Sequence, residues 1–192
     1  DIRKQDNKIN LMESLLQDLY SCNRIRIICE RINRQKIIND PIDLTSYLSE
    51  VEDIIRKTDS VHAKAYYNIF HLITSGKEIY YDELDHYVQY FEGSLGIEYL
   101  KEFYLHLMNY CIRQFNAGDF NYILKYFNYI KLLESRKMLL DNGVIGISRF
   151  KNIVLASIIL RKKKWAIEFM DKYAVSLPET KKISRESFLT LN

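Results

Sequence analysis

The sequence predicts an all-α protein, built as an α-solenoid of stacked antiparallel helical hairpins. Apolar residues recur at spacings of three and four along nearly the whole chain, which is the pattern of amphipathic helices. No stretch alternates apolar and polar residues between hairpin turn pairs, so strands are not expected. Tight turns are expected at Gly76, Gly118 and 161–163, and their separations of 42 and about 43 residues indicate a repeated helical hairpin.

The first forty residues predict two helices, or one long bent helix, over 7–38. Their apolar residues follow one continuous three-and-four alternation: Ile9, Met12, Leu16, Leu19, Tyr20, Ile25, Ile28, Cys29 and Ile32. Pro41 lacks an amide donor and disfavours a helical residue before it, so it ends this pattern. Asp43 is suited to cap a helix over 44–57, and the polar run 58–60 is suited to cap the next one.

The remaining periodic segments predict six further helices, separated by glycines and by one irregular connection. Gly76 stands where a left-handed residue ends a helix, and Gly118 ends the longest periodic stretch. The connection 138–146, which contains an Asn-Gly pair, is the least regular part of the chain. The helices are expected over residues 61–75, 84–91, 99–117, 120–136, 147–161 and 164–176.

The second helices of two hairpins resemble the tetratricopeptide repeat. Their turn and core positions are Gly118-Asp119-Phe120 with Ile123, Phe127 and Ile130, and Trp165-Ala166 with Met170, Tyr173 and Pro178. The period near 42 exceeds the 34 residues usual for that repeat. From Arg149-Phe150-Lys151-Asn152-Ile153-Val154 to Arg185-Glu186-Ser187, the chain resembles a family of uncharacterised bacterial tetratricopeptide-like proteins, a likeness that spans roughly residues 95–192. The resemblance implies an α-solenoid with a scaffolding role, and it implies no enzymatic activity.

Composition and charge argue against several classes of function. The net charge of +3 is too small to require a nucleic-acid partner, although it divides into −7 over residues 41–100 and +8 over residues 101–192. Three cysteines without a CxxC pair argue against a disulfide framework and a zinc site, and they indicate a reducing cytoplasm. No apolar run approaches the roughly 20 residues of a membrane span, so no membrane partner is expected.

Because the chain begins with Asp1 and stops within a helical pattern, we expect a single repeat domain, 1–192, that is a fragment of a longer protein.

Neither enzymatic activity nor a cofactor is expected, because the sequence has no glycine-rich phosphate loop, Walker lysine or His-Glu-x-x-His motif. One alternative is a metal-dependent helical enzyme, since Asp82 and Glu83 precede His86 by four and three residues and share its helix face. Glu102 and His106 are the obvious suppliers of further ligands. A solvated acidic helix turn explains the same residues without a metal.

The high aromatic content, with 15 tyrosines, indicates a protein-binding surface. Adjacent helical positions differ by about 100°, so neighbouring tyrosines cannot all face a core, and tyrosine is favoured in recognition surfaces. We therefore expect a protein or peptide partner on the concave face of the solenoid. The expected contact residues are Tyr66, Tyr67, Tyr104, Tyr122 and Tyr126.

A basic run lies beside the single tryptophan and consists of Arg161, Lys162, Lys163 and Lys164. Together with the basic residues at 181, 182 and 185 it is suited to phosphates or acidic peptides, which gives a nucleic-acid-associated module as a second alternative. Half of the run is expected at a helix C-terminus, where cations complement the helix dipole, so a solvated turn explains it as well. Trp165 is expected to pack between hairpins.

The last helical segment predicts an uncovered end. It carries the apolar residues Ile183, Phe188, Leu189 and Leu191, whereas a repeat array ends in a helix with a polar outer face. We therefore expect self-association through the C-terminal end, or cover by residues outside the chain, for a face that includes Trp165, Phe169 and Phe188.

Overall fold

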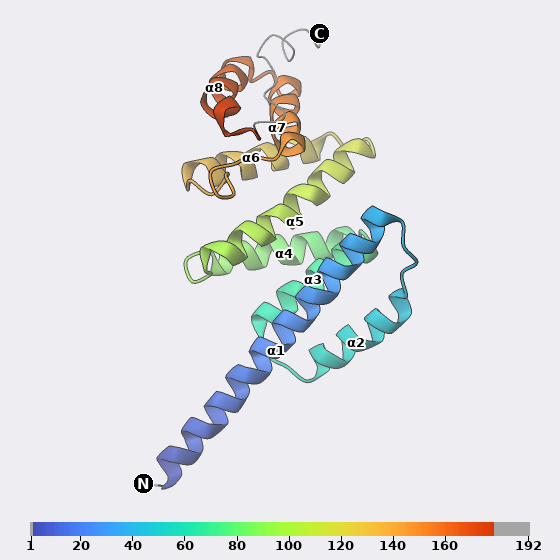
Figure 1. The fold of residues 1–192 in the computed structure, drawn as a ribbon, viewed down its shortest axis with the longest axis vertical. Helices are drawn as coiled ribbons and strands as arrows, with labels where there is room; N and C mark the ends of the chain where they lie inside the picture. Colours follow the sequence, from blue (N-terminus) through green and yellow to red (C-terminus); the bar gives the residue numbers. More distant parts are fainter. Residues whose placement is uncertain (1, 179–192) are drawn as a thin grey trace. The chain divides into compact units, whose positions relative to one another are not determined.

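A computed structural model describes residues 2–178, and within them every regular element is a helix (Figure 1). The described part holds eight α-helices and one short 3-10 helix, so the all-α prediction is confirmed. The chain divides into two compact units, Asp1–Leu95 and Gly96–Asn192. Each unit is described by itself, and the expectation of one repeat domain over 1–192 stays a prediction.

Unit 1 is organised around its third helix. Its elements are α1 (Ile2–Ile38), α2 (Leu44–Arg56), α3 (Val61–Thr74) and α4 (Glu78–Phe91). Helix α3 packs against the other three, and the fully buried side chains of Ile25, Ile28 and Ile32 give α1 its place in this core. Of the two alternatives over 7–38, the structure has the single long helix, and Figure 1 shows its N-terminal part running beyond α2 and α3.

The predicted caps begin α2 and α3. The Asp43 carboxylate accepts a hydrogen bond from the Ser46 backbone amide at 3.0 Å, and the Ser60 hydroxyl accepts one from the Ala63 amide at 3.3 Å. Such caps satisfy amides that have no partner within the helix. Both cap assignments made from the sequence are therefore confirmed.

Unit 2 is a succession of helices in which each packs on the next along the chain. They are α5 (Ile97–Asn116), α6 (Asn121–Ser135), α7 (Ile147–Ile159) and α8 (Lys163–Tyr173), followed by the 3-10 helix Ala174–Ser176. Fully buried Phe103, Ile130, Phe150 and Phe169 supply one large core side chain from each α-helix. The observed boundaries fall within a few residues of those expected from the apolar pattern.

The three expected tight turns all contain a residue in the left-handed backbone region. The φ angles are 67° at Gly76, 102° at Gly118 and 57° at Arg161. Glycine adopts this region at little cost, whereas a residue with a side chain loses about 1–2 kcal/mol there. The turns at the glycines therefore follow from local chemistry, while the turn at Arg161 needs the packing of α7 against α8 to hold it.

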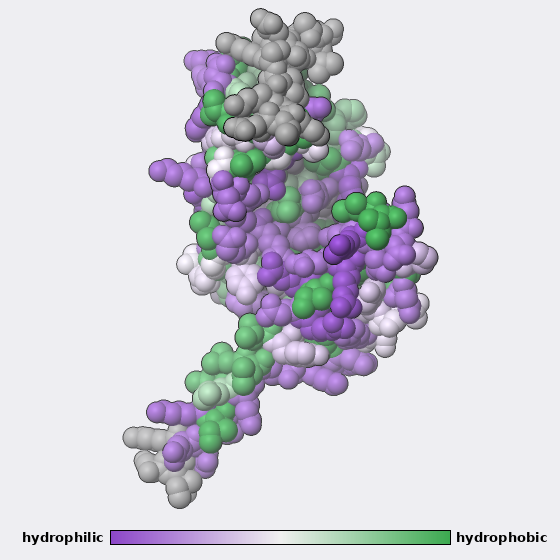
Figure 2. All heavy atoms as spheres, viewed as in Figure 1, coloured by the Kyte–Doolittle hydropathy of each residue, from purple (hydrophilic) through white to green (hydrophobic). Residues whose placement is uncertain are grey.

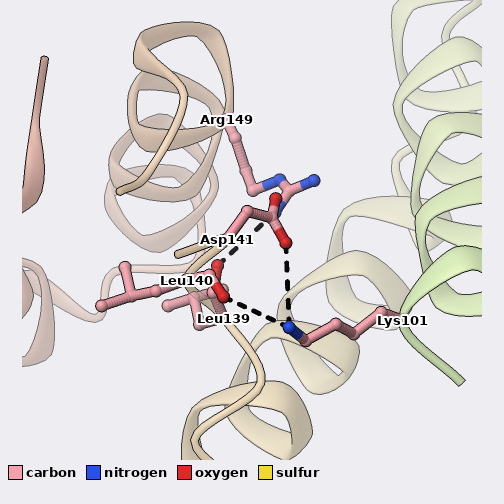
Figure 3. Close-up of polar contacts among 5 residues, drawn as sticks. All are labelled: Lys101, Leu139, Leu140, Asp141 and Arg149. Atoms are coloured by element: carbon pink, nitrogen blue, oxygen red, sulfur yellow. Dashed lines mark hydrogen bonds and ion pairs between the residues drawn. The ribbon is translucent and has the colours of Figure 1, made fainter. Parts of the chain in front are cut away.

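The irregular connection between α6 and α7 is fastened to unit 2 by two cations (Figure 3). Asp141 and Val144 exchange two backbone hydrogen bonds around Asn142-Gly143, both of which have positive φ. Arg149 Nη1 lies 3.3 Å from Asp141 Oδ2, and Lys101 Nζ lies 3.9 Å from Asp141 Oδ1. The same two side chains donate to the backbone carbonyls that precede Asp141, those of Leu139 and Leu140.

Candidate interaction surfaces

Four of the five tyrosines expected on a binding surface lie in the core. Tyr66, Tyr104, Tyr122 and Tyr126 are between 1% and 4% exposed. Tyr104 packs against the ring of Tyr129, and Tyr122 lies edge-on to Tyr110, so these rings stabilise helix contacts instead of facing solvent. Burial raises the pKa of the Tyr126 phenol, as expected for a hydroxyl removed from water. The expectation of an exposed tyrosine strip is therefore wrong for these four residues.

Tyr67 is half-buried and belongs to an aromatic cluster on one side of unit 1. Its hydroxyl donates to Glu52 Oε1 at 3.1 Å, and its ring lies 4.4 Å from that of His71, which stacks on Tyr80 at 4.4 Å. Burial and then the Glu52 contact raise the pKa of Tyr67 to about 12. Burial also lowers the pKa of His71, although Glu52 opposes that shift.

This aromatic cluster packs helices of unit 1 together, and acid should destabilise it. His71 Nε2 is buried without a hydrogen-bond partner and lies 3.8 Å from Glu52 Oε1. A neutral imidazole between two tyrosine rings joins α3 to α4, and protonation would place a charge among apolar rings. His71 belongs to no recognisable catalytic motif in the sequence, and only the fold brings its partners together from three helices.

The metal alternative has no assembled site in the part of the chain that the structure describes. Among residues 2–178 no group of three or more histidine, cysteine, aspartate or glutamate side chains is close enough to hold an ion. Asp82, Glu83 and His86 are exposed on α4, and the last two border a shallow hollow with Tyr90 and Phe91. Glu102 and His106 are half-buried on α5 of the other unit, where burial and then Arg113 lower the pKa of His106 to about 4.

The basic run lines a hollow of about 370 Å³ in unit 2, together with Trp165 and Glu168. All four cations are exposed, but Lys163 and Lys164 lie in the first turn of α8. Half of the run was expected at a helix C-terminus, and Arg161 and Lys162 directly follow α7, which ends at Ile159. Lys163 and Lys164 add their charges to the positive end of the α8 dipole, so this end of the helix carries positive potential.

Trp165 takes the packing position expected of it. Its ring stacks on Phe169 at 5.1 Å and meets the edge of Phe127 at 4.8 Å, so it joins α8 to α6. These contacts hold the indole within unit 2 and leave the four cations as the exposed part of the hollow. The basic residues at 181, 182 and 185, and the apolar residues of the predicted C-terminal end, lie outside the described residues.

The largest exposed apolar surface of unit 1 runs along the first half of α1. Every described side chain from Gln5 to Gln17 is exposed. Seven apolar residues of this half, each between 52% and 62% exposed, form what we call the α1 stripe: Ile9, Leu11, Met12, Leu15, Leu16, Leu19 and Tyr20. Figure 2 shows these hydrophobic side chains gathered on the projecting part of the helix. Monomeric soluble proteins rarely expose contiguous apolar surface of this kind.

The α1 stripe and the buried face of α1 point in different directions. At 100° per residue, the residues of the stripe centre nearly half a turn around the helix from Ile25, Ile28 and Ile32. Both sets were predicted as parts of one helical pattern. This angular change was readable in the sequence and was the signal that α1 has two separate apolar faces.

The three cysteines are buried. Cys22 Sγ lies 3.6 Å from the Ser60 hydroxyl, and burial raises the pKa of its thiol. A thiol that resists ionisation is a poor nucleophile and a poor metal ligand. Cys22 and Cys29 therefore act as small apolar side chains in the core of unit 1.

The described chain is thus an all-helical protein of two compact units, with an exposed apolar helix face in one and an exposed basic cluster in the other. Comparison with protein-family models, with curated proteins and with solved structures finds no match for it. Within residues 2–178, no helix combines the length and the apolar character needed to cross a bilayer.

Proposed function

We propose that this protein is a non-catalytic helical interaction module that binds another protein through the α1 stripe. The observation that carries the proposal is the projecting half of α1, where seven large apolar side chains stand more than half exposed. A monomeric soluble domain buries such a surface, because each fully buried Leu, Ile or Met side chain gains about 1.5–3 kcal/mol. A helical partner laid along the stripe would bury it in the usual helix-on-helix manner.

The repeated hairpin supports a scaffold of the α-solenoid kind, similar to tetratricopeptide proteins. Turns with left-handed residues recur at Gly76, Gly118 and Arg161, and each joins two antiparallel helices that pack on one another. Repeat arrays of this type serve mainly as binding surfaces. Three cysteines without a CxxC pair support a reducing compartment such as the cytoplasm, where disulfides are rare.

Affinity capture from cells of the source organism tests this proposal with the full chain as bait. The matched pair is Met12→Glu/Leu16→Glu, which places two charges on the stripe, and Ile37→Glu, which places one on the same helix at an 81% exposed position. We expect a discrete partner with the wild type and Ile37→Glu that is absent with the double variant. Identical captures from all three baits would contradict binding through the stripe.

The basic hollow favours one second candidate, a module that binds acidic polymers such as nucleic acid. Four exposed cations stand together around Trp165, three of them in consecutive lysines. Binding of random single-stranded or duplex DNA should then fall steeply as salt rises, because phosphate contacts release counterions. Lys163→Glu/Lys164→Glu should abolish it, and absence of binding at low salt would exclude this candidate.

A further inference from the structure

We infer that the occupant of the α1 stripe is the same stripe of a second copy, paired antiparallel, so that the protein self-associates through the first half of α1. This inference rests on the proposed function, because it names the partner of the same surface. Its first support is the spacing of the apolar residues. Ile9, Met12, Leu16 and Leu19 are separated by three, four and three residues, and this order reads the same in both directions.

A spacing that is unchanged by reversal lets two antiparallel copies meet without any mismatch. Ile9 of each helix then lies opposite Leu19 of the other, and Met12 lies opposite Leu16. Leu11, Leu15 and Tyr20 flank this seam and widen it. A two-fold arrangement of one surface with itself is the commonest kind of protein oligomer, and the three-and-four alternation is the pattern of paired helices.

The charges of the same segment favour the antiparallel direction. Residues 3–8 contain three basic residues and one acidic residue, whereas residues 9–20 contain Glu13 and Asp18 and no base. In the register above, Lys8 of each helix lies within one turn of Asp18 of the other, while residues 3–7 lie opposite 21–25, whose one charged residue is Arg24. Parallel pairing would lay like charges together, which is unfavourable between facing helices.

The area of the stripe suits a dimer. Seven side chains of this size, each more than half exposed, present on the order of 700 Å² per copy, close to the roughly 800 Å² per partner of a standard interface. A membrane surface fits less well, because helices that lie on bilayers carry a polar face rich in lysine and arginine. The charged residues of 5–20 are one base, Lys8, against the three acids Asp6, Glu13 and Asp18.

Sedimentation equilibrium of the full chain tests whether a second copy occupies the α1 stripe. We expect a dimer whose fraction rises over about 5 to 500 μM and disappears in Met12→Glu/Leu16→Glu, while Ile37→Glu keeps it. Because residues 12, 16 and 37 are all exposed, the variants should keep the wild-type circular dichroism and thermal midpoint. A wild-type chain that stays monomeric over this range, with or without binding to vesicles of anionic phospholipid, overturns the inference.

Two measurements test whether the two helices pair antiparallel: a charge substitution at Lys8 and a distance between spin labels. Lys8→Glu should weaken an antiparallel dimer about fivefold, since one favourable contact is lost at each end, whereas a parallel dimer would hardly change. Spin labels on Gln5→Cys, a position on the seam face of the helix, should lie about 27 Å apart along the axis in an antiparallel pair and within about 10 Å of each other in a parallel pair. The native cysteines are buried, so the label goes to the new position. Close labels would show parallel pairing and overturn the direction.

The same measurements separate this inference from the proposed function. A monomeric chain that still captures a partner through the stripe overturns self-association and leaves the interaction function standing. A monomeric chain without stripe-dependent capture overturns both. A dimer that the double variant abolishes supports the inference whether or not a further protein binds elsewhere.

Discussion

The two halves of α1 share one helical pattern and have opposite surroundings. In the second half Ile25, Ile28 and Ile32 are fully buried against α3, whereas in the first half the equally apolar α1 stripe stands in solvent. Both halves have the three-and-four spacing of an amphipathic helix. The difference teaches that periodicity indicates which residues need a partner, while the partner itself is set by the rest of the fold. The described side chains from Gln5 to Gln17 are all exposed, so the rest of unit 1 does not cover this part of the helix.

Truncation in each half gives the largest contrast. Ile28→Ala should lower the free energy of unfolding of unit 1 by about 2–5 kcal/mol, because it removes buried methylene groups and leaves a cavity. Leu16→Ala, a similar truncation on the exposed half, should change it by less than about 0.5 kcal/mol. Urea unfolding at low protein concentration, where dimers are dissociated, measures both. Equal losses would show that the first half of α1 is packed in solution.

The boundary between the halves is fastened by Thr58. Its hydroxyl donates to Asp18 Oδ1 at 2.9 Å and accepts the Ser60 amide at 3.1 Å, in a position that is 9% exposed. Thr58→Val keeps the shape and leaves these groups unpaired, so we expect a loss of about 1–3 kcal/mol in unfolding free energy. Thr45→Val, which is exposed on α2, is the matched control and should be close to neutral. A neutral Thr58→Val would contradict a role for these two hydrogen bonds in holding α1 to unit 1.

Local chemistry explains why most helix boundaries could be predicted. Pro41, Asp43, Ser60, Gly76 and Gly118 act through their own backbone and side-chain preferences, and the structure has the expected stop, cap or turn at each. These effects need no knowledge of distant residues. The helices of both units were therefore accessible from the sequence alone.

The candidate surfaces depend on contacts with neighbouring helices and were therefore harder to predict from the sequence. Tyr104 and Tyr122 were expected at a surface, yet rings from the neighbouring helix, Tyr129 on α6 and Tyr110 on α5, cover them. The glutamate that contacts Tyr67 and His71 comes from α2, and only the fold brings it there. Tertiary contacts of this kind leave no periodic signal in the sequence.

Acid should destabilise the packed core of unit 1 and leave the first half of α1 unaffected. Because the pKa of His71 is lowered in the folded state, the unfolded chain binds its proton more readily, and stability is lost as the pH falls below about 6.5. His71→Leu should therefore lose less stability than the wild type between pH 7 and pH 5, measured by urea midpoints. The exposed His86→Leu is the control and should keep the wild-type loss. Parallel losses in all three proteins would contradict a role for His71.

The smallest expected effect on unfolding free energy comes from placing a proline in the first half of α1. Proline inside a helix costs about 3 kcal/mol or more when the helix is held by packing, since it removes a backbone hydrogen bond and clashes with the preceding turn. Ser14→Pro lies where every neighbouring side chain is exposed, so the turns before it can unwind without disturbing the core. We expect less helical circular dichroism and no dimer, with a urea midpoint close to that of the wild-type monomer.

Ile27→Pro supplies the comparison for Ser14→Pro within the same helix. Ile27 is 42% exposed, yet it stands between buried Ile25 and Ile28, so a break there detaches α1 from α3. That variant should lose about 3 kcal/mol or more of unfolding free energy. If Ser14→Pro destabilised unit 1 as much as Ile27→Pro, the first half of α1 would be part of the core, and the contrast between the two halves would be wrong. If Ser14→Pro left both the midpoint and the dimer intact, the core would be independent of that half, and the self-association would have to lie on another surface.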